Sequence, residues 1–160
     1  MFTSILSGAI LMDYKEAIQV LPLLLSFVPM LMDTSGNCGN QSSTMVIRGM
    51  AVGDIELKDV LRVVWKEFRV GLLCGAVLAA ANFVRLILQY PDRLALNLVI
   101  VLSLMLTIVL AKIIGCVLPM LAEKMKLDPA IMAAPLITTI VDASSLLIYF
   151  KIASMMLHLS

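Results

Sequence analysis

Three long apolar stretches constrain this chain more than any other feature of its sequence. They cover residues 70–90, 94–122 and 129–159. A helix needs about 20 mainly apolar residues to cross the hydrocarbon core of a bilayer, so each stretch is long enough. The chain is 61% hydrophobic and 14% charged, whereas soluble domains average about 45–50% apolar and about 25% charged. We therefore predict an all-α integral membrane protein with one domain over residues 1–160.

Two further segments complete an expected set of about five membrane helices. Residues 17–50 are long enough to cross only if the polar run DTSGNCGNQSST, at 33–44, lies inside the helix. Residues 1–12 are apolar but too short to cross, so we expect either a truncated first helix or an interfacial helix. Residues 52–68 place the apolar Leu57, Leu61, Val64 and Phe68 at helical spacing between charged residues. That pattern predicts an amphipathic helix at the membrane surface.

The distribution of Lys and Arg predicts the orientation of the helices. The connection at 48–69 is rich in both, and the connection at 123–128 holds Lys124 and Lys126. The positive-inside rule places these two connections in the cytoplasm. We expect a multi-pass protein of the plasma membrane, in contact with lipid on its outer faces, whose C-terminus faces outside.

The polar run at 33–44 admits two interpretations. Small residues such as Gly36 and Gly39 let membrane helices pack closely, and Ser or Asn side chains hydrogen-bond between them. Alternatively, oxygen-bearing side chains at this depth line a water-filled path, where polar or irregular backbone is tolerated.

An acidic residue lies near the middle of the last span. Asp142 is about 20 Å from the start of its helix, close to the midplane, and an acid there is by default a functional hypothesis. Thr138, Ser145 and Tyr149 share its face at helical spacing, so this face is expected to meet something wet or polar. Two other roles concern Lys112 in the preceding span: it pairs with Asp142 as a buried salt bridge, or it snorkels towards the cytoplasmic end.

Several classes of function are not indicated. The net charge is +1, which provides no basic field for nucleic acid. The cysteines lie far apart and the single histidine, His158, is close to the C-terminus. Neither a zinc site, a disulfide framework nor a nucleophile–base pair is expected, so the chain does not read as an enzyme.

Longer blocks carry a resemblance to a known family. SGNCGNQSSTMVIRGMAVGDI, KEFRVGLL and LPMLAEKMKLDPAIMAAPLITTIVDASSLLIYF follow one another in the chain. Their order and spacing resemble the transmembrane domain of the MgtE magnesium transporters from about residue 17 to 157. The resemblance implies a homodimer with five helices per subunit, a pore along the dimer axis and Mg²⁺ as the transported ion. It also implies that Asp142 is the main intramembrane ligand, that Asn40, Thr44 and the Gly36 region line the pore, and that carbonyls around Thr138 contribute.

The residue chemistry agrees with a hard divalent cation. Mg²⁺ takes oxygen ligands and sheds water reluctantly, and no cluster of softer ligands is present. The same oxygens suit Mn²⁺ and Co²⁺. One alternative is an ion-coupled secondary transporter that uses Asp142 as a proton or sodium site, although no internal inverted repeat is evident. Another is a non-conducting assembly subunit.

Two departures from the family bear on these expectations. The cytoplasmic acidic domain and the CBS pair of most relatives have no counterpart in these residues. We therefore expect conduction that is constitutive or gated by a separate regulatory partner. Lys112 and Ala134 stand where the family favours polar uncharged residues, and a lysine facing the pore opposes the passage of a cation.

Overall fold

The computed structural model describes residues 22–157, apart from the side chains of 131–134. The expected first helix at 1–12, the start of the 17–50 span, the side chain of Ala134 and His158 lie outside these residues. The described chain is helical, with no strand between residues 22 and 157. This agrees with the all-α class predicted from the apolar stretches.

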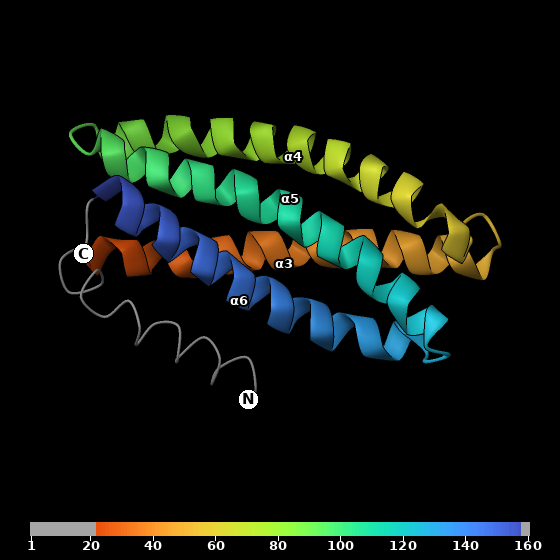
Figure 1. Cartoon of the computed structure of the whole chain (residues 1–160). Coiled ribbons are helices and arrows are strands. Elements are labelled where there is room, and N and C mark those ends of the chain that lie inside the picture. The colour runs from red at the N-terminus through yellow and green to blue at the C-terminus, as the bar shows by residue number, and fades with distance from the viewer. Residues whose placement is uncertain (1–21, 158–160) are drawn as a thin grey trace.

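Residues 22–157 form four long helices, which run in opposite directions from one to the next along the chain (Figure 1). They are α3 (Pro22–Ala51), α4 (Val60–Gln89), α5 (Leu94–Lys124) and α6 (Pro129–Leu157), with a short 3₁₀ turn, η1 (Leu57–Asp59), before α4. The central helix is α5, which packs against all three of the others, and α6 also packs against α3.

Within the described residues, three segments are long and apolar enough to cross a membrane: Leu57–Gln89, Leu94–Lys124 and Pro135–Leu157. The polar run keeps α3 out of this set. Yet α3 is one continuous helix of 30 residues, with the run inside it, and it lies alongside the apolar helices in the same bundle (Figure 1). The prediction that the run lies within a helix is confirmed.

Local signals set two of the helix boundaries. The turn between α4 and α5 holds Pro91, which has no backbone N–H to continue a helix. At the start of α6, the Asp128 carboxylate accepts a hydrogen bond of 2.8 Å from the backbone N–H of Ala130. Asp128 is therefore the N-cap, with Pro129 in the first helical position, as predicted.

The prediction of a separate amphipathic surface helix at 52–68 is wrong. Residues 52–56 form a turn, and from Val60 the chain continues without a break through Gln89. The expected apolar face is also not the packed one, since Leu61 is 83% exposed. The face of α4 that packs against α5 consists of small residues. A Cβ on Gly71 would lie 3.2 Å from the Val109 Cα, and one on Gly75 would lie 3.4 Å from Met105. Close approach of α4 to α5 therefore fixes the rotation of α4 from its first turns onward.

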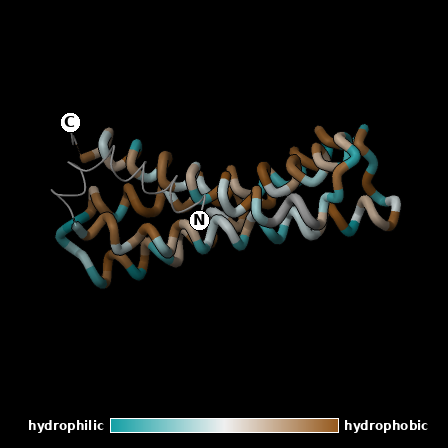
Figure 2. The backbone as a smooth tube through the Cα atoms, turned by 90° about the horizontal axis from the view of Figure 1, so that it is seen from below, coloured by the Kyte–Doolittle hydropathy of each residue, from teal (hydrophilic) through white to brown (hydrophobic). Residues whose placement is uncertain are grey.

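The connections at 52–59 and 125–128 lie at the same end of the bundle, and the connection at 90–93 lies at the other end (Figure 1). Hydrophilic residues, in teal, lie in the turns at both ends of the bundle (Figure 2). The predicted Lys/Arg-rich regions at 48–69 and 123–128 therefore lie at one end of the bundle, with most of their basic residues in the ends of α3, α4 and α5 that flank the two connections.

Candidate functional site

The polar run of α3 has two faces. Its buried residues are Ser35, Gly36, Cys38, Gly39, Ser42 and Ser43. Its exposed residues are Asp33, Asn37, Gln41 and Thr44, with Asn40 half-buried. At about 100° per residue, the members of this second group fall within about 100° of the helix circumference. We call them the polar stripe.

The buried face packs tightly against α5 and α6. Ser35 and Ser145 share a hydrogen bond of 2.8 Å between their hydroxyls. A Cβ on Gly115 would collide with the Gly39 carbonyl, so α3 and α5 touch backbone to backbone. This half of the run is the interhelical packing that one interpretation predicted.

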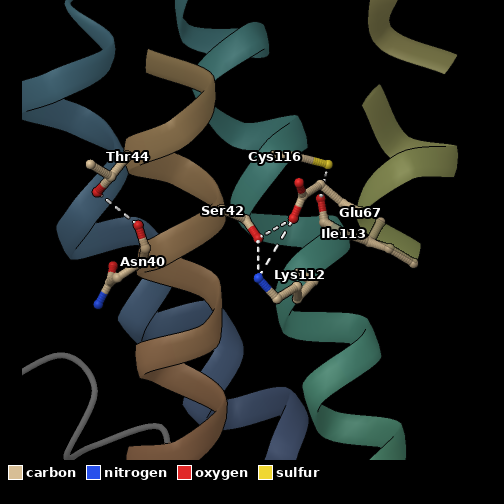
Figure 3. A network of polar contacts seen from close by, with 7 residues as sticks. All are labelled: Asn40, Ser42, Thr44, Glu67, Lys112, Ile113 and Cys116. Atoms are coloured by element: carbon tan, nitrogen blue, oxygen red, sulfur yellow. Dashed lines mark hydrogen bonds and ion pairs between the residues drawn. The ribbon is translucent and has the colours of Figure 1, made fainter. Parts of the chain in front are cut away.

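The polar stripe has few contacts with the rest of residues 22–157. The Thr44 hydroxyl donates to the Asn40 carbonyl at 2.9 Å, which is a bond within the same helix. Figure 3 shows Asn40 and Thr44 on one side of α3, with Ser42 pointing away from them on the other. The opposite face of the same helix therefore carries the exposed oxygen-bearing side chains, and the second interpretation, that they line a water-filled path, stays a prediction for this face.

Asp142 lies at the edge of the polar stripe. A Cβ on Gly36 would be 3.9 Å from the Asp142 Oδ1, so the carboxylate rests against the glycine backbone. Asp142 is half-buried. Its carboxylate has no hydrogen bond or ion pair with any residue in the described range. An unpaired carboxylate beside a row of oxygens is suited to a cation or its water shell.

Thr138 lies one helical turn from Asp142. A Cβ on Gly39 would lie 3.0 Å from Ile137, so Thr138 sits at the level of Gly39 and Asn40 on α3. Its hydroxyl donates to the Pro135 carbonyl at 3.1 Å. The structure thus brings the predicted site residues to successive turns of two packed helices.

The rest of the expected α6 stripe is used in packing. Ser145 bonds to Ser35, and the buried Tyr149 hydroxyl donates to the Leu24 carbonyl at 2.9 Å. The prediction that this whole face meets a wet surface is therefore wrong for Ser145 and Tyr149, because α3 covers them.

Both expected roles of Lys112 are wrong. Its Nζ lies 3.7 Å from the Glu67 Oε2, and it donates to the Ser42 hydroxyl at 3.2 Å. Ser42 in turn donates to the Glu67 Oε2 at 2.6 Å. Lys112 is 6% exposed and Glu67 7%, so the lysine neither pairs with Asp142 nor snorkels. The network lies on the side of α3 that faces α4 and α5, opposite Asn40 and Thr44 (Figure 3).

The sequence analysis does not predict that Glu67 is buried, because the charged residues around it indicate a surface helix. Its signal is a row at spacing four on α4: Val63, Glu67, Gly71, Gly75 and Ala79, all buried. An acid within a row of small packed residues needs a cation from the neighbouring helix, and Lys112 supplies it.

The acidic, cysteine and histidine side chains of the described chain are scattered rather than clustered. Residues 22–157 contain no group of three or more His, Cys, Asp or Glu side chains placed to hold a metal ion. Asp142 and Asp33 are the acidic side chains that lie at or within the polar stripe of the described chain.

Comparison with known proteins identifies the family of this chain. The family model MgtE, described as a divalent cation transporter, matches residues 28–152. The chain belongs to the MgtE family. It is 36% identical over 158 residues to the magnesium transporter MgtE of Bacillus subtilis (strain 168), which covers 99% of this chain and 35% of that protein. It is 37% identical over 157 residues to the magnesium transporter MgtE of Thermus thermophilus, covering 98% and 34%.

This MgtE-family chain spans about a third of the length of the curated relatives that it matches. The family model includes α4 and α5 whole and most of α3 and α6, and so covers both the polar stripe and Asp142. The relatives are named as transporters rather than as enzymes, in agreement with the sequence analysis.

Proposed function

We propose that the chain transports Mg²⁺ across the plasma membrane through a pore on the twofold axis of a homodimer, with Asp142 as the main ligand within the membrane. One observation carries the proposal: the polar stripe lies along a helix of a membrane bundle, with the Asp142 carboxylate at its edge beside Gly36. The names of the relatives support magnesium as the ion.

The polar stripe argues for water beside α3. Uncompensated polar groups in hydrocarbon cost several kcal/mol each, so this face is poorly suited to lipid. The neutral oxygens of Asn40 and Thr44 can hydrogen-bond the water shell of the ion without stripping it. That suits Mg²⁺, which dehydrates slowly, although the same set accepts Mn²⁺ and Co²⁺.

A second copy would complete the site. One chain supplies one Asp142 carboxylate, and a twofold axis beside the polar stripe would bring in a second Asp142 and a second row of oxygens. In the proposed orientation, the connections at 52–59 and 125–128 face the cytoplasm and the C-terminus faces outside, following the excess of Lys and Arg.

Mg²⁺ uptake into proteoliposomes, followed with an entrapped magnesium-sensitive dye, tests the proposal. Asp142→Ala is expected to abolish uptake with the protein still folded, because no residue of the described chain bonds to the carboxylate. The matched control is Asp92→Ala, in the exposed turn between α4 and α5, which should leave uptake unchanged. Uptake by Asp142→Ala at the wild-type rate would overturn the assigned ligand.

The driving force separates a channel from a coupled transporter. Uptake through a pore should follow the Mg²⁺ gradient and the membrane voltage, with no gradient of protons or sodium across the vesicle. A strict requirement for either gradient would instead support the ion-coupled alternative, which the comparisons do not favour.

A further inference from the structure

A cavity of about 710 Å³ opens where α3 ends and α4 begins. Three cationic side chains line it: Arg48 from the last turn of α3, and Arg62 and Lys66 from successive turns of α4. All three are exposed, and none forms an ion pair with another residue of the described chain. Apolar side chains, including the exposed Met45 and Val52, lie beside them on the wall.

The cavity carries one positive charge in excess. Asp54 and Asp59 also line it, but Asp59 already accepts the backbone N–H of Glu56 at 3.0 Å. Glu67, at the inner wall, is paired with Lys112. Three cations therefore stand against two carboxylates, which leaves a balance suited to a ligand with a single negative charge.

A neighbouring aromatic side chain sets the depth of this cavity in the membrane. Trp65 lies between Arg62 and Lys66 in the sequence of α4 and is 59% exposed. Its ring stacks on Phe68, with the ring centroids 5.6 Å apart. The Arg69 guanidinium lies 6.0 Å from the centre of the Trp65 ring. An exposed tryptophan beside cationic residues at the end of a membrane helix belongs at the level of the lipid headgroups.

We propose that this cavity is a binding site for the headgroup of an anionic phospholipid with one phosphodiester charge. The guanidinium groups of Arg48 and Arg62 and the ammonium of Lys66 would hold the phosphate, as charge-assisted donors do. The apolar wall would receive the upper part of an acyl chain. Basic pockets between membrane helices bind headgroups in this way, and the volume lies within the usual range for ligand sites. This inference does not depend on the ion that the protein transports.

Trp65 provides the assay, because it is the only tryptophan in the chain. The protein is reconstituted in phosphatidylcholine vesicles that contain a minor fraction of phosphatidylglycerol. The acyl chains of one lipid or the other are dibrominated, which quenches a tryptophan on contact. Wild-type Trp65 should be quenched more by brominated phosphatidylglycerol than by the same fraction of brominated phosphatidylcholine.

The variants separate a site from general attraction to a charged surface. Arg62→Gln with Lys66→Gln should lower the preference for phosphatidylglycerol by about fivefold per removed cation, from about 1 kcal/mol for each. Lys58→Gln is the matched control: it removes a charge at the same end of the bundle, from a residue paired with Glu56 at 2.8 Å and outside this cavity. It should keep the preference.

Arg48→Gln, on the other helix, gives an independent variant and should also lower the preference. Equal quenching by the two lipids in the wild-type protein would overturn the proposal. So would an equal loss of preference in Lys58→Gln and in the cavity variants, since that result would mean attraction without a site.

Discussion

The buried network behind α3 gives a stability prediction that can be worked out from its geometry. Glu67→Leu would leave the Lys112 ammonium buried, with only the Ser42 hydroxyl 3.2 Å away as a partner. At 3.7 Å, two unit charges attract by about 4.5 kcal/mol for an effective dielectric constant of about 20. Loss of one member of a buried pair typically costs about 3–5 kcal/mol, because the remaining charge is unpaired. We expect Glu67→Leu to destabilise the fold by about that amount.

Removal of both charges should restore most of the stability. The attraction in the pair offsets the cost of taking both groups out of water, so a well-packed apolar pair is often as stable as the ion pair. Glu67→Leu combined with Lys112→Met should therefore lie close to the wild type. Lys112→Met alone should cost less than Glu67→Leu alone, because Glu67 keeps its 2.6 Å hydrogen bond from Ser42.

Native cysteines make unfolding measurable in detergent. Cys38 and Cys116 are buried, so a maleimide dye that fluoresces on reaction with thiols reports their exposure on heating. For a chain of this size, about 3–5 kcal/mol corresponds to a midpoint lower by about 6–20 °C. Glu123→Leu, at an exposed glutamate near the end of α5, is the control and should change little. The reasoning fails if Glu67→Leu melts with the wild type, or if the double variant melts below both single variants.

Four other substitutions test the two faces of α3. Gly115→Leu places a side chain against the α3 backbone and should cost about 3 kcal/mol or more in the same melting assay, since backbone cannot move aside cheaply. Ser145→Ala removes the 2.8 Å bond to Ser35 and should cost about 0.6 kcal/mol, the average for such bonds in membranes, and no more than about 1.7 kcal/mol. In a cysteine-free background, Thr44→Cys should react with a small charged thiol reagent and be protected by Mg²⁺, whereas the buried Ser43→Cys should stay inert. Equal reaction at the two positions would contradict the assignment of faces.

Signals in the local sequence predicted most of the fold. The start of α6 follows from Asp128 and Pro129, and the apolar lengths of α5 and α6 identify them as membrane helices. The start of α4 was mispredicted because its first turns are rich in charge, which is also typical of a surface helix. Its rotation is set instead by Gly71 and Gly75 against α5, and a pattern of small residues is weak in a single sequence.

The candidate site could be predicted only residue by residue. An acid at mid-depth singles out Asp142, and oxygen-bearing residues four apart single out Asn40 and Thr44. That Asp142 lies against Gly36 depends on the register of two antiparallel helices, which no local pattern specifies. The partner of Lys112 was missed for the same reason, because it comes from α4, whose rotation was unknown.

The two interpretations of the polar run are compatible because a helix turns through about 100° per residue. A row of small polar residues longer than two turns must face both ways, so one row can pack a bundle and also present oxygens outside it. On the packed face, small size matters most, since Gly39 leaves room for the α5 backbone at Gly115. On the other face, the oxygen atoms matter most, since Thr44 and Gln41 are exposed. Enlarging a residue on the first face should therefore affect stability before transport, and removing an oxygen from the second should affect transport without loss of stability.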